Sequence, residues 1–236
     1  MKVKQRPIFS KDEPMSMHLQ QEIEHLQNKL LTLVATAKAA VEKSVKSVEA
    51  RDAATAQAVV DGDFAIDRAE VDLEEDCLKI LALYQPVATN LRVIVSVMKI
   101  NNDIERIGDL AVNIAERALF LCSKGPVEAP SDLAEMRAKA LAMLTRSLDA
   151  LVRMDTKCAR EVRASDDEVD ALNRKLFQEF AAAVRRNPDH VECLLSYLSV
   201  GRHLERIADY ATNIAEDVIY LTEGTIVRHK PTLPEE

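Results

Sequence analysis

Several residue types are rare or missing in this 236-residue sequence. It contains no tryptophan, aromatic residues make up 4% of it, and only five glycines are present. Alanine, leucine, glutamate, lysine and arginine dominate instead, which is typical of helical proteins. Apolar residues account for 47% of the chain, enough for a packed core. The composition therefore predicts a folded, all-α protein.

Long apolar segments and a basic charge balance are also missing. The longest apolar run, 93–98, is interrupted by Ser96 and is far shorter than a bilayer span. The basic N-terminal residues are not followed by the apolar segment that a secretory signal contains. The net charge is −8 without an offsetting basic patch, which argues against nucleic-acid binding. We therefore expect a cytoplasmic protein with no transmembrane segment and no nucleic-acid partner.

Cysteine is scarce, and its spacing argues against a metal or disulfide framework. The four cysteines form no C-x-x-C pair: Cys77, Cys122, Cys158 and Cys193. We interpret them as buried reduced thiols, with a zinc or disulfide set as the less favoured alternative. The sequence also lacks a G-x-G-x-x-G segment, a P-loop and a nucleophile elbow. No enzyme class is indicated, and we expect a protein that is not an enzyme.

What the sequence does contain is a twelve-residue phrase that occurs twice. Residues 105–116 and 205–216 agree at nine of twelve positions. Four shared polar positions fall within about 80° of one helical face. They are Glu105, Asp109, Asn113 and Glu116, repeated as Glu205, Asp209, Asn213 and Glu216. Carboxylates four residues apart on a helix repel each other, so the doubled stripe predicts a cation or a basic partner that neutralises it.

The repeat extends over most of the chain. Asp52 is a predicted N-cap, and Asp155 is predicted to interrupt the helices of the second half as Asp52 does in the first. Gly224 is a predicted helix stop, and Gly62 is expected to weaken or kink its helix. A proline ends the second helix of each half, because the residue before proline avoids the helical region. The predicted helices are 17–49, 53–84 and 88–122 in the first half, and 132–154, 156–186 and 189–223 in the second.

These elements predict two antiparallel three-helix bundles in tandem, with six long helices in all. The linker contains one glycine and two prolines, and Ser131 is its predicted helix cap. Long apolar stripes on elongated bundles favour a homodimer. The predicted organisation is an N-terminal arm at 1–16, a first bundle at 17–123, a linker at 124–131, a second bundle at 132–224 and a C-terminal tail at 225–236.

A second acidic pair occurs in each half, on the middle helix. If that helix and the helix of the repeated phrase are antiparallel neighbours, four carboxylates converge in each bundle. All-oxygen sites of this kind select cations such as Mg²⁺, Mn²⁺, Ca²⁺ or iron. The candidate ligands are Asp63, Asp67, Glu105 and Asp109 in the first half, and Asp166, Asp170, Glu205 and Asp209 in the second. Further oxygen donors are Glu70, Asn113, Glu116, Asn213 and Glu216.

Other interpretations of the acidic stripes remain open. Arg106 and Arg206 flank them and could neutralise them as ordinary surface ion pairs, leaving a helical scaffold without metal. An oxygen-ligand metalloenzyme is a further alternative, but it needs an open coordination position and a nearby general base. A di-iron oxidase is disfavoured, because only one E-x-x-H motif occurs, at Glu22 and His25.

The repeated phrase and two further segments together resemble the PhoU family of bacterial phosphate-signalling accessory proteins. The segments are Gln85-Pro86-x-Ala88-x-x-Leu91-Arg92 and Gly62-Asp63-x-x-Ile66-Asp67, and the resemblance covers residues 17–223. It implies tandem three-helix bundles whose E(D)-x-x-x-D motifs bind metal ions, often as multinuclear clusters. Divalent or iron-type ions, with Fe, Mn, Mg and Zn as candidates, would then occupy the eight principal carboxylates named above.

The same resemblance implies a function. Members are cytoplasmic and non-enzymatic, and they act as negative regulators of the phosphate-starvation response and of phosphate uptake. They are thought to link the ATPase subunit of the phosphate ABC transporter to a membrane sensor histidine kinase. This chain departs from the family pattern at Asn90 and Ala208. Asn173 and Phe177 replace the acidic residues that continue the stripe in the first half, which argues against two equivalent sites.

Overall fold

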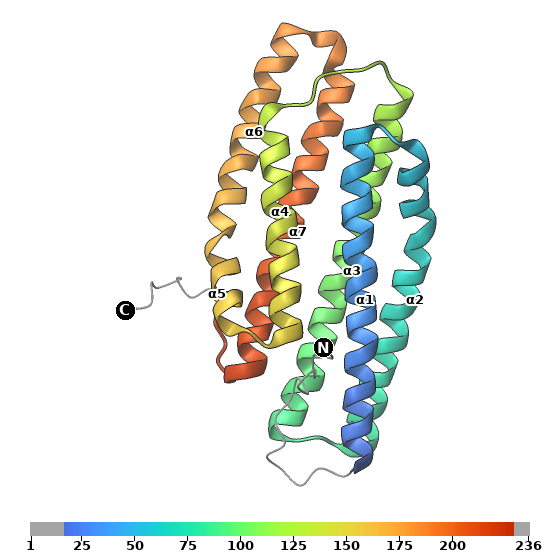
Figure 1. Ribbon diagram of the computed structural model, residues 1–236, viewed down its shortest axis with the longest axis vertical. Coiled ribbons are helices and arrows are strands. Elements are labelled where there is room, and N and C mark those ends of the chain that lie inside the picture. The colour runs from blue at the N-terminus through green and yellow to red at the C-terminus, as the bar shows by residue number, and fades with distance from the viewer. Residues whose placement is uncertain (1–16, 229–236) are drawn as a thin grey trace, which may run out of the picture.

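The computed structural model describes residues 17–228, and all regular structure in that range is helical. Two elongated bundles, α1–α3 and α4–α7, lie side by side (Figure 1). The all-α fold and the two tandem bundles are confirmed. The elements are α1 (Met17–Ala50), α2 (Ala53–Tyr84), α3 (Ala88–Ser123), α4 (Ser131–Arg153), α5 (Thr156–Ala164), α6 (Asp166–Arg186), the 3₁₀ turn η1 (Pro188–His190) and α7 (Val191–Glu223).

Two predicted segments fall partly or wholly outside the described residues. The N-terminal arm at 1–16 lies entirely outside them, as does the predicted tail from residue 229 onward. Within 17–228, no helix has a stretch that is both long and apolar enough to cross a membrane.

The prediction of one uninterrupted helix at 156–186 is wrong, because the helix is broken at Ser165 into α5 and α6. The Ser165 hydroxyl donates to the Glu161 carbonyl at 2.9 Å, and its backbone N–H donates to the Val162 carbonyl at 3.0 Å. A serine hydroxyl that bonds to the backbone competes with helical geometry. Acidic residues at 166–168 follow the break, and their negative charges stabilise the positive N-terminal end of a new helix. The last helix also begins later than predicted, since Pro188 starts the 3₁₀ turn that precedes α7.

The predicted helix caps are mostly confirmed. Asp52 accepts a hydrogen bond from the Thr55 N–H at 3.1 Å, and Asp155 accepts one from the Cys158 N–H at 3.0 Å. Gly224 ends α7 with a φ of 72°, a left-handed conformation that suits glycine. The predicted cap at Ser131 is wrong. Ser131 is the first residue of α4, and its hydroxyl donates to Glu179 of α6 instead.

The helices that carry the repeated phrase form the centre of the molecule. α3 packs against α1, α2 and α7, whereas α7 packs against α3, α4, α5 and α6. The apolar residues of both phrases are fully or almost fully buried: Ile104, Ile107, Ala111 and Ile114 in α3, and Leu204, Ile207, Ala211 and Ile214 in α7. Burying one such branched side chain contributes about 1.5–3 kcal/mol. The packing of α3 against α7 joins the two bundles. It also determines which face of each repeated phrase stays accessible to solvent.

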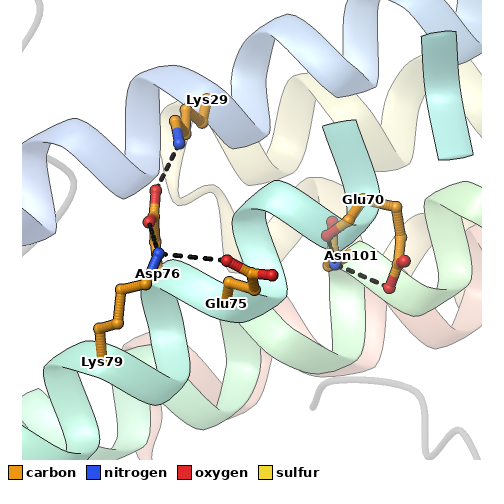
Figure 2. A network of polar contacts seen from close by, with 6 residues as sticks. All are labelled: Lys29, Glu70, Glu75, Asp76, Lys79 and Asn101. Carbon is orange, nitrogen blue, oxygen red and sulfur yellow. Dashed lines mark hydrogen bonds and ion pairs between the residues drawn. The ribbon is translucent and has the colours of Figure 1, made fainter. Parts of the chain in front are cut away.

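Polar contacts hold α2 against both of its neighbours in the first bundle (Figure 2). Lys29 of α1 forms an ion pair with Asp76 of α2, which lowers the pKa of that carboxyl. On the other side, the buried Asn101 side chain of α3 donates to the Glu70 backbone carbonyl at 3.0 Å and to the Glu70 carboxylate at 3.1 Å. These contacts hold the middle helix between its two neighbours.

Alanine substitution should have opposite effects on the stability of the fold at two helical glycines, Gly62 and Gly201. The expected kink at Gly62 is wrong, because α2 runs through it as a continuous helix and an added Cβ would meet no atom within 4 Å. Gly62→Ala should therefore stabilise the fold by about 0.5–1 kcal/mol. At Gly201, an added Cβ would lie 2.1 Å from Cδ2 of the buried Leu176. Gly201→Ala should destabilise by about 1–3 kcal/mol. Urea unfolding midpoints of the two variants would measure both changes, and equal shifts would contradict the packing.

Candidate metal centres

The first acidic group lies between α2 and α3. Asp63, Asp67 and Asp109 each bring one carboxylate oxygen within 4.8 Å of the other two. Gly108 permits the close approach of the helices, since a Cβ there would lie 3.2 Å from the Ile66 side chain. One oxygen of Asp63 is buried and has no hydrogen-bond partner in the described part of the chain. A buried anionic oxygen without a donor is costly, and a cation bound by these three residues would satisfy it.

Glu105 belongs to the same helix face but not to this group of three. Arg106 is its neighbour, with Nε 3.3 Å from the Glu105 carboxylate and a second nitrogen 3.4 Å from the Asp109 carboxylate. Partial burial raises the pKa of Glu105, followed by the charge of Asp109, while Arg106 lowers it. Three of the four predicted ligands thus converge in the first bundle, and the fourth lies beside them.

The second group lies between α6 and α7 and has a different composition. Asp170, Glu205 and Asp209 bring their carboxylate oxygens within 4.8 Å of one another. Asp166 does not join them. Its carboxylate accepts a hydrogen bond from the Thr212 hydroxyl at 3.3 Å. The predicted ligand that does not join its group of three is therefore Glu105 of the repeated phrase in the first bundle. In the second bundle it is Asp166 of the middle helix.

Burial and the charges of neighbouring carboxylates raise a carboxyl pKa in both groups. Partial burial, and then the charges of Asp67 and Asp109, raise the pKa of Asp63. In the second group, partial burial and the Glu205 charge raise the pKa of Asp209 to about 6. The neighbouring carboxylates thus make Asp63 and Asp209 harder to ionise. A bound cation reverses this effect, and carboxylate oxygens in such sets suit hard or borderline metal ions.

The other predicted donors are engaged elsewhere. The Asn113 amide donates to the Asp109 carbonyl at 2.9 Å, and Glu70 accepts from Asn101. Glu116 lies 3.7 Å from Arg117, and Glu216 pairs with Arg163 at 3.1 Å. Asn213 faces a separate cavity between α3 and α7. The geometry places none of these five in either group of three.

Histidine and cysteine contribute to neither group. Glu22 and His25, the single E-x-x-H motif, are exposed on α1. Within residues 17–228 the four cysteines are free thiols, with Cys77 and Cys193 buried and the other two half-buried. The predicted full burial of Cys122 and Cys158 is therefore wrong.

Sequence reasoning missed a buried carboxylate pair between the bundles. Asp103 is 8% exposed and Asp217 is 2% exposed, and they face each other across α3 and α7. Lys99 lies 3.3 Å from Asp217, whereas burial and the Asp217 charge raise the pKa of Asp103 to about 7. Asp103 lines a cavity of about 490 Å³ with Lys99 and Arg228. The repeat contained one sequence signal of this pair, because His203 and Arg117 stand at the positions equivalent to Asp103 and Asp217 and so break the similarity of the two halves.

Comparisons with known proteins identify the family. The PhoU domain matches this chain twice, at residues 30–118 and 133–218. The chain belongs to the PhoU family. The phosphate-specific transport system accessory protein PhoU homolog of Aquifex aeolicus is 36% identical over 214 residues, covering 91% of this chain and 97% of that protein. The homolog of the same name in Pseudomonas aeruginosa is 36% identical over 218 residues, covering 91% of this chain and 89% of that protein.

Solved PhoU structures share the fold. The crystal structure of PhoU from Pseudomonas aeruginosa matches with a TM-score of 0.84 and 35% identity, covering 88% of this chain and all of that one. The phosphate transport system regulatory protein PhoU from Streptococcus pneumoniae matches with a TM-score of 0.81 and 28% identity, covering 89% of this chain and 99% of that one. The PhoU resemblance of the repeated phrase is thereby confirmed along both bundles.

The raised pKa of Asp209 predicts a pH-dependent effect of Asp209→Asn in chelator-treated protein. Its folded pKa of about 6 exceeds the reference value of 3.8, so the ionised carboxylate destabilises the folded state above pH 6. The variant should be more stable than the wild type at pH 7.5, by up to about 1 kcal/mol after allowance for solvent exposure. The difference should disappear as the pH falls from 6 to 4. Urea unfolding at several pH values measures it.

Bound metal should reverse the order of stability of the wild type and Asp209→Asn. Mn²⁺ at saturating concentration should raise the wild-type melting temperature and raise that of Asp209→Asn by less, because a ligand to the folded state has been removed. An Asp209→Asn variant that is less stable than the wild type at pH 7.5 without metal would contradict the repulsion within the second group.

Proposed function

We propose that this protein is a cytoplasmic, non-enzymatic regulator of phosphate uptake and a negative regulator of the phosphate-starvation response. Family membership supports this proposal, because its relatives are named as accessory and regulatory proteins of phosphate transport. We further propose that it acts as an adaptor between the ATPase subunit of a phosphate ABC transporter and a sensor histidine kinase. The proposed identity of those partners follows from the family resemblance.

The proposal includes metal binding at both acidic groups. The observation that carries it is the convergence of three carboxylates within 4.8 Å in each bundle, with an unpartnered buried oxygen on Asp63 in the first. The proposed ions are Fe, Mn, Mg or Zn, held by Asp63, Asp67 and Asp109 and by Asp170, Glu205 and Asp209. Glu105 and Asp166 lie next to these groups, where burial and then the charges of Asp109 and Asp170, respectively, raise their pKa values. They are proposed to complete the two groups when a metal binds.

A contact surface adjoins the first group. Phe64, Val71 and Leu78 of α2 are all at least half exposed, and their spacing of seven places them along one helix face. Asp67 of the metal group lies on the same helix, one turn from Phe64. Exposed apolar residues gathered in this way typically mark protein contacts. We propose this face for a transporter subunit, the kinase or a second copy of the chain, which would form the expected homodimer.

A genetic experiment tests the regulatory role and the carboxylates together. Deleting the gene should cause phosphatase expression in phosphate-rich medium, and the wild-type gene should restore repression. A variant carrying Asp63→Asn, Asp67→Asn and Asp109→Asn should fail to restore it, because the all-oxygen site loses its charge. Phosphatase activity per cell, with immunoblotting to confirm equal protein levels, measures the outcome.

A matched control separates the metal group from general surface charge. Asp72→Asn removes an exposed aspartate from the same helix outside the group and should restore repression fully. Tight repression in the deletion strain would contradict the proposed function. Full repression by the triple variant would instead favour a scaffold without metal. Elemental analysis of purified wild-type and triple-variant protein distinguishes that alternative directly, and hydrolase or oxidase assays on metal-loaded protein test the metalloenzyme alternative.

A further inference from the structure

A polar cavity lies at the contact between the two bundles and is separate from both acidic groups. It has a volume of about 490 Å³, and its walls come from α3, from α7 and from the residues that follow α7. None of the residues that line it belongs to either group of three. All of them are polar or charged: Lys99, Asn102 and Asp103 of α3, Thr212, Asn213 and Glu216 of α7, and Arg228.

Asp103 is a buried carboxylate without a partner in this cavity. The residue is 8% exposed, and its side chain lines the cavity wall. Among residues 17–228, no group donates a hydrogen bond to its carboxylate, and no basic nitrogen lies within 4 Å of its oxygens. An ionised carboxylate that is buried without a donor is costly. Asp103 therefore lacks a compensating positive charge, and the cavity is the space from which a ligand can supply one.

The two basic residues of the cavity are engaged with other carboxylates. The Lys99 ammonium lies 3.3 Å from Asp217, and Arg228 lies 3.9 Å from Asp217 and 3.8 Å from Glu216. Asp217 is 2% exposed, and one of its oxygens still has no hydrogen-bond partner in the described part of the chain. The acceptors that stay unsatisfied at this contact are thus carboxylate oxygens. A ligand that satisfies them has to be a cation or a hydrogen-bond donor.

Uncharged oxygen donors line the same cavity. Asn102 and Asn213 carry amide oxygens, and Thr212 carries a hydroxyl. The Thr212 hydroxyl donates to Asp166, and its oxygen can still accept or coordinate. Carboxylate, amide and water oxygens are the ligands that hard divalent cations such as Mg²⁺ prefer. Mg²⁺ usually keeps several waters and uses one or two carboxylates, which suits a cavity of this volume with Asp103 in its wall.

The repeat provides an internal comparison on the other side of the contact. His203 and Arg202 stand at the positions equivalent to Asp103 and Asn102, and Arg117 stands at the position equivalent to Asp217. Two oxygen donors are thereby replaced by arginines and a third by an imidazole. The two sides of the contact therefore differ in the ligand chemistry that they offer, and the oxygen donors belong to the side of the cavity.

We propose that this cavity binds one hydrated divalent cation of the Mg²⁺ class, with the Asp103 carboxylate as the principal ligand and the amide oxygens of Asn102 and Asn213 as further donors. Since α3 and α7 belong to different bundles, the ion bridges them. Its charge also competes with Arg228, whose contacts in the cavity are long. The inference is independent of the regulatory role and of metal at the acidic groups, because Asp103 belongs to neither group.

Counting the Mn²⁺ ions bound to the full-length, chelator-treated protein tests the site. Mn²⁺ replaces Mg²⁺ and is measured by electron paramagnetic resonance, with Mg²⁺ added afterwards as a competitor. A reference variant without the acidic groups should still bind one Mn²⁺ per chain, and Mg²⁺ should displace it. That reference variant carries Asp63→Asn, Asp67→Asn, Asp109→Asn, Asp170→Asn, Glu205→Gln and Asp209→Asn.

Two substitutions in the cavity should change the affinity in opposite directions. Asp103→Asn in the reference variant should weaken Mn²⁺ binding about tenfold or more, because a carboxylate ligand becomes a neutral amide. Arg228→Ala should strengthen it about two- to fivefold, because the loss of an exposed competing charge is worth as much as an exposed ion pair. In the otherwise unaltered chain, Asp103→Asn should lower the number of bound Mn²⁺ ions by one.

Asp149→Asn is the matched control, because it makes the same change at an exposed aspartate of α4 and should leave Mn²⁺ binding unaltered. Far-UV circular dichroism and urea midpoints verify that each variant is folded. An unchanged affinity and ion count in Asp103→Asn would overturn the inference, as would an equal loss in Asp149→Asn. A folded reference variant that binds no Mn²⁺ would show that water alone occupies the cavity, and the acidic groups and the regulatory role would be unaffected.

The inference stays testable if the reference variant does not fold. The ion count of the otherwise unaltered chain with and without Asp103→Asn then decides it, since this single change removes no member of either acidic group. A difference of one ion supports the site between the bundles, and equal counts contradict it.

Discussion

The apolar packing of α2 against α3, and of α6 against α7, is the constraint on which the rest of the structure depends. Ile66 fits against Gly108 so closely that a Cβ at that position would lie 3.2 Å away. The same approach carries Asp63 and Asp67 to within 4.8 Å of Asp109. Hydrophobic burial thus stabilises a contact that electrostatics alone would oppose. Burial, and then the charges of Asp67 and Asp109, raise the pKa of Asp63, and this cost of holding the carboxylates together is the physical basis for expecting a cation.

Duplication gave each bundle the same framework, and later substitution made the bundles chemically different. Leu73 and Leu176 are both buried, but Asn101 of the first bundle is replaced in the second by Gly201, whose missing side chain admits Leu176. Glu70, which accepts a hydrogen bond from Asn101, is matched in the second bundle by Asn173. Small changes in packing have therefore redistributed charge, although both bundles keep three converging carboxylates.

The contact between α3 and α7 shows the same divergence most clearly. Positions that the repeat makes equivalent lie on opposite sides of this contact. A substitution in one repeat therefore changes one side without changing the other. Asp103 and Asp217 leave one side with buried negative charge partly balanced by Lys99. On the other side His203 and Arg117 occupy the equivalent positions, and burial together with the charges of Arg206 and Arg117 lowers the pKa of His203. A symmetric core thus supports an asymmetric surface.

The helical class, the duplication, the cap at Asp52, the break at Asp155 and the helix faces that bear the carboxylates could all be predicted from the amino-acid sequence. These follow from local periodicity and from hydrogen bonds within a few residues. The sequence did not predict which three carboxylates of each predicted four lie together, because side-chain distances depend on how closely neighbouring helices pack. The break at Ser165 and the burial of Asp103 against Asp217 were likewise apparent only from the fold. Such features arise where local preferences compete or where residues far apart in the chain meet, and periodicity carries no information about either.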